Sequence, residues 1–262
     1  MPEEQKNVLE VIVFENSHKD VVNNSPFCVK IFLYMKAAEV PHDFPKPKVW
    51  DLGPRGKLPY AKFADGSVVP DSAIIIQKVQ AMGFDLDGVL SDEQKVQSRL
   101  IVATLEERFY FALLYLYYQH PKNWPLTHKL FFGNLPFRLR WLISRSARKG
   151  ALSALHGQGT GRRPVDEVVA INNKVIDDLA DLLGDKPNFF DTPKLTTADV
   201  VAYAMLDKAL YPPLPFNPIG DHLKTKLNLL AFLDAITKAY FPSVYEARQS
   251  SSSSSSAPPK KK

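Results

Sequence analysis

The 262-residue sequence contains a single cysteine, Cys28. One thiol cannot form an internal disulfide, a cysteine zinc cluster or a dithiol redox pair, so we expect a reducing compartment and no metal site. The longest apolar run, residues 109–118, is too short to span a bilayer. Residues 1–7 are polar and lack the apolar stretch of a signal peptide. These features predict a cytoplasmic protein.

The chain also has little net charge once its C-terminal end is set aside. The formal charge is +5, and Lys260, Lys261 and Lys262 supply three of these charges. The remainder is close to neutral, so we expect no nucleic-acid partner. Seven serines at 250–256 precede the lysines. This low-complexity composition predicts a disordered tail over residues 247–262.

The N-terminal part begins with a strand pattern and a helix pattern. A β-branched and aromatic run at 8–14 predicts a buried strand. The apolar segment from Pro26 to Pro41 predicts a helix that a proline ends. Three prolines between 40 and 50 leave room only for a short strand at a sheet edge.

A hairpin pattern follows. Residues 57–63 and 67–69 read as short strands on either side of an Asp-Gly pair at 65–66, where glycine accepts a positive φ. Asp71 and Ser72 then open an apolar helix. The order strand, helix, short strand, hairpin, helix predicts a small α/β domain with a mixed sheet.

Beyond residue 90 the patterns are helical. We predict helices over 91–118, 165–183, 196–210 and 222–240, with a glycine-rich break at 150–161. Thr196 and Asp199 have the spacing of a capping box at the start of the third helix. We therefore expect a second domain that is mostly helical and contains no further strands.

The start of the first helix suits an anion. Pro26 fits the first helical position, which makes Ser25 the N-cap and puts Cys28 in the first turn. Main-chain N–H groups and the positive end of the helix dipole converge there and would stabilise a thiolate or a carboxylate. An ordinary helix start with a small buried cysteine accounts for the same residues.

Four motifs, in this order and spacing, resemble the glutathione transferase superfamily. They are Ser-Pro-Phe-Cys at 25–28, Gly-Lys-Leu-Pro-Tyr at 56–60, Pro-Asp-Ser at 70–72 and Thr-Thr-Ala-Asp at 196–199. Residues 157–162 and 183–187 are similar to the branch that contains metaxins and failed-axon-connections proteins.

The resemblance implies an α/β thioredoxin-like N-terminal domain followed by an all-α C-terminal domain, the arrangement of glutathione transferases. We accordingly predict a glutathione-binding domain over 1–82, a linker over 83–90 and a helical domain over 91–246.

The resemblance also implies where glutathione would bind. The peptide bond between Leu58 and Pro59 is expected to be cis, so that the Leu58 main chain pairs with the cysteinyl part of glutathione like a strand. Lys57, in the same motif, is included among the expected binding residues. Asp71 and Ser72 are expected at the γ-glutamyl end, where a helix N-terminus accepts the carboxylate.

Three side chains are candidates for the thiol chemistry. Ser25 holds the first motif position, and its hydroxyl would donate to the glutathione thiolate and lower the pKa of that thiol. Cys28 is the alternative, as a mixed-disulfide or redox group, and Asn24 is a third donor. We favour Ser25, with Cys28 as packing.

Two further segments have two interpretations each. Five aromatic residues are either core or the lining of an apolar co-substrate pocket: Tyr110, Tyr115, Tyr117, Tyr118 and Trp124. Residues 131–149 mix apolar and basic side chains, which suits either peripheral contact with an anionic membrane or a packed helix with solvated arginines.

The resemblance implies a glutathione S-transferase that uses glutathione as a substrate and conjugates or reduces a hydrophobic electrophile, as in stress responses and detoxification. A homodimer is compatible with the family. The alternative is a non-catalytic, metaxin-like interaction protein at an organelle or membrane surface.

Overall fold

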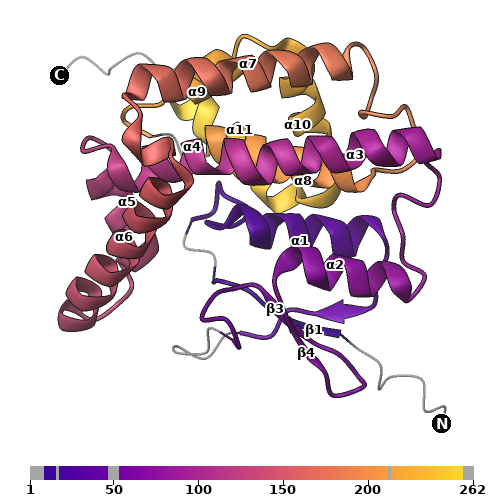
Figure 1. Cartoon of the computed structure of the whole chain (residues 1–262), viewed down its shortest axis with the longest axis horizontal. Coiled ribbons are helices and arrows are strands. Elements are labelled where there is room, and N and C mark those ends of the chain that lie inside the picture. Colours follow the sequence, from indigo (N-terminus) through magenta and orange to yellow (C-terminus); the bar gives the residue numbers. More distant parts are fainter. Residues whose placement is uncertain (1–8, 16–17, 47–52, 212–213, 256–262) are drawn as a thin grey trace.

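The computed structural model describes residues 9–15, 18–46, 53–211 and 214–255. Its first elements are β1 (Leu9–Ile12), α1 (Pro26–Ala37), β2 (His42–Asp43), β3 (Tyr60–Lys62), β4 (Val68–Pro70) and α2 (Ser72–Ala81). Figure 1 shows α1 and α2 between the sheet and the helices that form the rest of the molecule. This is the predicted succession of strands and helices.

The four strands form a mixed sheet in the order β2-β1-β3-β4. β1 pairs in parallel with β2 and antiparallel with β3, and β3 and β4 form the hairpin. Gly66 has a φ of 80° at the turn, as the Asp-Gly signal predicts. The second strand is two residues long and lies at the edge, which confirms the expectation from its prolines.

Helix α1 is covered on nearly all sides. Pro26 occupies its first turn and Ser25 caps it, as predicted. Its buried apolar side chains share one hydrophobic core with β1 and pack against α2 and α8. A helix that is apolar all round requires such enclosure, and α1 therefore joins the sheet to the helical part.

The remaining elements are helical. They are α3 (Asp92–Thr104), η1 (Leu105–Phe109), α4 (Tyr110–Leu114), η2 (Tyr115–Gln119), α5 (Trp124–Phe132), α6 (Phe137–Gln158), η3 (Thr160–Arg162), α7 (Val165–Leu183), α8 (Thr197–Leu210), α9 (Pro218–Leu223), α10 (Leu227–Tyr240) and α11 (Pro242–Ser255). η1 and η2 are π-helical turns within one continuous helix that spans the predicted 91–118. The described residues contain no strand beyond β4.

The glycine-rich break predicted at 150–161 is largely wrong. α6 continues through Gly150 and Gly157, where an added Cβ would meet nothing within 4 Å. Each glycine costs a helix interior only about 1 kcal/mol, and the alanines and leucines around them favour helix. The helix ends at Gly159, whose φ of 106° supplies the left-handed C-cap.

Two other predictions need correction. The helix expected over 222–240 begins only at Leu227, as α10, and residues 222–223 belong instead to the end of the preceding helix α9. The serines expected in a disordered tail continue α11 as far as Ser255, and the Ser251 hydroxyl donates to the carbonyl of Ala247. Residues 256–262 lie outside the described part of the chain.

Helix α8 lies at the centre of the helical part and is almost entirely buried. The predicted capping box is confirmed at its start, where the Asp199 carboxylate accepts from the Thr196 N–H at 2.7 Å. Asp199 also accepts from the Phe189 N–H at 2.8 Å. These bonds satisfy a fully buried carboxylate, although burial still raises its pKa.

Among the described helices, none has the length and apolar character needed to cross a membrane. Within the same residues, no group of three or more His, Cys, Asp or Glu side chains is arranged to hold a metal ion.

Candidate functional site

Strand register brings the three predicted binding segments to one end of the sheet. The last residue of β1, Ile12, pairs with the first residue of β3, Tyr60, which in turn pairs with the last residue of β4, Pro70. The chain therefore leaves β1 toward α1, enters β3 and leaves β4 at the same end. Residues 58–59 and 71–72 directly adjoin these paired positions.

The α1 start is tied to this end of the sheet by Asn23. Its side-chain amide donates to the carbonyl of Phe14 at 2.8 Å, two residues after β1, and its Oδ1 accepts from the Ser25 N–H at 3.0 Å. The prediction missed this residue. An Asx side chain two positions before an N-cap is a known local turn signal and could have pointed to it.

Ser25 is buried and has the extended backbone of an N-cap. Its Oγ accepts from the Cys28 N–H at 3.4 Å, so its hydroxyl proton points elsewhere. The Ser25 side chain also lies close enough to the Cys28 thiol to lower its pKa slightly. A neutral thiol is a weak acceptor, so an anionic sulfur of a ligand would compete well for this proton.

Cys28 is fully buried, and burial raises the pKa of its thiol to about 11 despite hydrogen bonds from Phe14 and Ser25. The thiol is therefore protonated at neutral pH and is a poor nucleophile. Asn24, the third candidate donor, is buried next to Ser25 in the chain.

The peptide bond between Leu58 and Pro59 is cis, as the resemblance implies. Both residues are buried, whereas Lys57 before them is exposed. Within the described residues the main-chain N–H and C=O of Leu58 make no hydrogen bond. These two groups are available to pair with an extended ligand.

Asp71 and Ser72 form the start of α2. Asp71 is the N-cap, with its Oδ1 accepting from the Ala73 N–H at 2.9 Å, and its φ of 78° is rare for a residue other than glycine. Such backbone outliers gather at ligand sites. Ser72 is buried, and its hydroxyl has no partner in the part of the chain described here.

Arg55, which the prediction did not single out, adds a cation to this end of the sheet. Its guanidinium lies 3.8 Å from the Asp71 carboxylate, and both side chains are about half exposed. Arg55 is offset by Asp71, and exposed Lys57, next to Leu58 in the chain, leaves this group of three charged residues with a net positive charge. Two cations and a helix N-terminus favour an anionic ligand with several hydrogen-bonding groups.

The predicted aromatic residues are divided between core and site edge. Tyr115 and Tyr117 are buried in the core. Tyr110 packs edge-on against Phe27 of α1, with ring centroids 4.8 Å apart. This contact puts one aromatic side chain of the helical part close to the Ser25 helix start.

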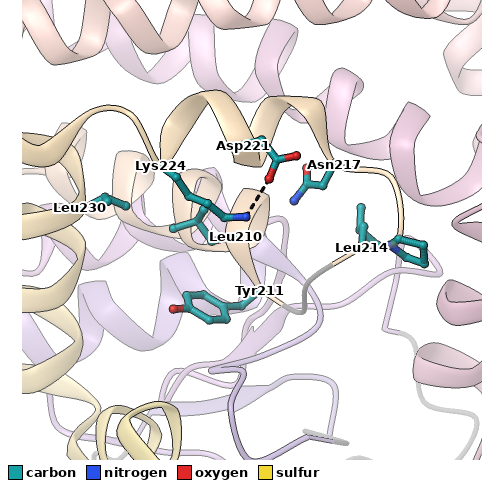
Figure 2. Close-up of a pocket in the computed structure, with 8 residues that line it drawn as sticks. Leu210, Tyr211, Leu214, Asn217, Asp221, Lys224 and Leu230 are labelled. Atoms are coloured by element: carbon teal, nitrogen blue, oxygen red, sulfur yellow. Dashed lines mark hydrogen bonds and ion pairs between the residues drawn. The ribbon is translucent and has the colours of Figure 1, made fainter. Parts of the chain in front are cut away.

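A separate pocket of about 410 Å³ lies at the C-terminal end of α8. Figure 2 shows its lining of Leu210, Tyr211, Leu214, Asn217, Asp221, Lys224 and Leu230. Its two charged groups neutralise each other, because Lys224 donates to Asp221 at 2.7 Å. The pocket contains none of the predicted binding residues and offers no free charge for catalysis.

Comparison with known proteins identifies the class to which this fold and site belong. Residues 26–123 match the glutathione S-transferase N-terminal domain family, and residues 173–236 match the glutathione S-transferase C-terminal domain family. The chain belongs to the glutathione transferase superfamily, with a thioredoxin-like N-terminal domain and a helical C-terminal domain.

Similar proteins fall into two groups. The isoprene-epoxide glutathione S-transferase of Rhodococcus sp. (strain AD45) is 29% identical over 225 residues, which cover 82% of this chain and 92% of that protein. Failed axon connections of Drosophila melanogaster is 26% identical, and the match covers 83% of this chain and 54% of that protein. Human Metaxin-2 is 25% identical over 76% of this chain and 75% of its own length.

Solved structures share the fold. The beta-etherase of Sphingobium sp. strain SYK-6 has a TM-score of 0.58 at 17% identity and covers 93% of this chain and 99% of its own. A glutathione S-transferase of Methylobacillus flagellatus, solved with glutathione bound, has a TM-score of 0.53 at 14% identity. The match covers 90% of this chain and 98% of that structure's chain. Related transferases therefore bind glutathione in this fold.

Proposed function

We propose that this protein is a glutathione transferase that conjugates glutathione to a hydrophobic electrophile. The observation that supports it most is the convergence of Ser25, the Leu58 main chain and the Asp71–Ser72 helix start at one end of the sheet. These segments offer a hydroxyl, a pair of main-chain groups and an anion site. They match the thiol, the peptide and the γ-glutamyl end of one tripeptide.

In this proposal the Leu58 N–H and C=O pair with the cysteinyl main chain, while the Ser72 hydroxyl and the α2 N-terminus hold the γ-glutamyl carboxylate. Asp71 receives the γ-glutamyl amine, and the positive charge of Arg55 and Lys57 compensates the ligand's carboxylates. Ser25 donates its hydroxyl proton to the ligand sulfur. This bond favours the thiolate over the thiol and so lowers the pKa of the ligand.

The reaction is then a direct attack. With a hydrophobic epoxide, the thiolate sulfur forms a bond to a ring carbon as the carbon–oxygen bond breaks, and the resulting alkoxide takes a proton from water. The protein contributes proximity and electrostatic stabilisation of the sulfur. The relative from Rhodococcus, named for an epoxide and glutathione, supports this electrophile class. Free Cys28 suits a reducing compartment such as the cytoplasm.

The test compares two N-cap variants. Ser25→Ala and Ser91→Ala each remove a helix cap, because the Ser91 hydroxyl caps α3 in the same way. Both should lose about 1 kcal/mol of stability. Only Ser25→Ala should lower the rate of conjugation to a hydrophobic epoxide, by about 10-fold, because a hydrogen bond to a charged group is lost. Equal rates in both variants contradict the assigned role of Ser25.

Similarity to Failed axon connections and Metaxin-2 supports a second candidate, a non-catalytic interaction protein that keeps the fold. Calorimetry separates the two. Absence of glutathione binding by the intact chain, together with no conjugation of a general electrophile, would end the transferase proposal and leave the second candidate.

A further inference from the structure

Charge is strongly segregated along this chain. Residues 108–165 contain ten Lys and Arg residues and no Asp or Glu. The whole chain has 33 basic and 28 acidic residues, so the other 204 residues are net acidic, with 23 basic against 28 acidic. The segment 108–165 includes all of α5 and α6. One part of the molecule is therefore cationic on an otherwise slightly anionic protein.

Helix α6 also exposes large apolar side chains. Phe137 is 80% exposed, Trp141 57% and Leu142 59%. At about 100° of rotation per residue, the three side chains spread over an arc of about 140°, which is less than half of the helix circumference. Figure 1 shows α5 and α6 extending away from the rest of the molecule at the lower left. These apolar side chains thus lie on a projection rather than in a groove.

Basic residues occupy the same side of α6. Arg138, Arg145 and Lys149 are exposed and make no ion pair with a described residue. The Arg145 guanidinium lies 4.9 Å from the centre of the Trp141 ring. We call these six residues, Phe137, Arg138, Trp141, Leu142, Arg145 and Lys149, the α6 face.

The other two arginines of α6 have structural roles. Arg140 donates to the carbonyl of Gly133 at 2.7 Å and to that of Leu135, which fixes the turn between α5 and α6. Arg148 donates to the carbonyl of Tyr118 at 3.1 Å and lies over the Trp124 ring. Internal contacts therefore hold the helix in place, and the α6 face is left without an intramolecular partner among the described residues.

We propose that the α6 face docks the protein onto a membrane of anionic phospholipids. Aromatic and leucine side chains on a helix insert at the boundary of headgroups and acyl chains, while Arg and Lys reach the phosphates. The complete lack of acidic residues over 108–165 removes repulsion from a negative surface. A projecting helix can reach a flat bilayer without reorganising the fold.

Vesicle sedimentation of the full chain tests the proposal. The protein should bind vesicles of phosphatidylcholine mixed with phosphatidylserine, and bind vesicles of phosphatidylcholine alone much less. Combined Arg138→Gln, Arg145→Gln and Lys149→Gln substitutions should weaken binding by on the order of 100-fold. Raising the salt concentration should weaken the wild type as well, because charges at a surface are screened.

A second variant tests insertion. Phe137→Ser with Trp141→Ser should reduce binding and remove the blue shift in tryptophan fluorescence that insertion produces. Controls are Leu227→Ser, at a leucine 77% exposed on α10, and Lys238→Gln on the same helix. Neither control should change binding. All these side chains are exposed, so thermal melting should be unchanged.

Failure to sediment with the phosphatidylserine vesicles overturns the proposal, as does binding that the α6 substitutions leave unchanged. Binding to polyglutamate without binding to either vesicle would mean that the face takes an acidic protein, which also overturns the lipid assignment.

Discussion

The ammonium group of Lys30 on α1 lies 2.6 Å from the carboxylate of Glu106 in η1. Lys30 is only 2% exposed, so this pair is an internal contact between the helix that begins at Ser25 and the long helix of the second domain. Two charges removed from water stabilise a fold only while they remain together. The pair thereby links the geometry of the candidate site to domain packing.

Glu106→Gln should destabilise the protein by about 3 kcal/mol, because it leaves the buried Lys30 ammonium without its counter-charge. Urea unfolding measures the effect. The matched control is Glu107→Gln, the exposed neighbour, which should change stability by less than about 0.5 kcal/mol. Equal effects from the two substitutions would show that the ion pair contributes nothing specific.

Asp71→Asn should raise the KM for glutathione by about 10-fold and leave kcat nearly unchanged. The asparagine oxygen can still cap α2, but the negative charge expected to meet the γ-glutamyl amine is gone. Steady-state kinetics over a range of glutathione concentrations gives both constants. Asp92→Asn, at an exposed acidic residue in the first turn of α3, serves as the control and should alter neither. A fall in kcat alone would assign Asp71 a different role.

Cys28 should react slowly with a thiol reagent in the native protein and rapidly after unfolding. Its side chain is fully buried, so a reagent cannot reach it in the native protein. The pKa of its thiol is about 11, so the reactive thiolate is scarce near neutral pH. The time course of alkylation with and without urea measures both rates. Fast native labelling below neutral pH would transfer the reactive role from Ser25 to Cys28.

Lys208→Met should stabilise the protein, and most strongly at low pH. Burial lowers the pKa of Lys208 to about 7, although the nearby Asp207 carboxylate opposes that shift. The ammonium faces the rings of Tyr117 and Phe131 and donates no hydrogen bond to a described residue.

Proton binding determines the direction in which stability changes with pH. The unfolded lysine has a pKa of about 10.4, so between about pH 7 and pH 10 the unfolded chain binds more protons than the folded one, and stability rises with pH. The buried charge therefore lowers the free energy of unfolding by its full amount below pH 7. Thermal melting of both proteins at several pH values should show a difference that shrinks as pH rises. Lys238→Met, on the surface of α10, should show no such trend.

Local rules explain most of what the sequence predicted correctly. The Ser25–Pro26 helix start, the Asp-Gly hairpin, the Asp71 cap and the Thr196–Asp199 box each depend on residues within four positions of one another. Such short-range bonds form wherever their residues occur in the right order. Their spacing also carried the resemblance to the glutathione transferase superfamily.

Partners that are distant in the sequence were not predicted. The ion pair of Arg55 with Asp71 and that of Lys30 with Glu106 depend on how separate elements pack. The continuation of α6 past Gly150 was missed for a related reason, because the modest helix cost of glycine is outweighed by contacts elsewhere along the same helix.

The sequence by itself determined the residues that can bind an anion at a helix start, because caps and turns are local. Only the tertiary structure decided that the segments containing Ser25, Leu58 and Asp71 lie at the same end of the sheet, since strand register aligns Ile12, Tyr60 and Pro70 and Asn23 links the start of α1 to Phe14. It also decided that Cys28 is fully buried, and burial, not its position in the first turn, dominates the pKa of its thiol.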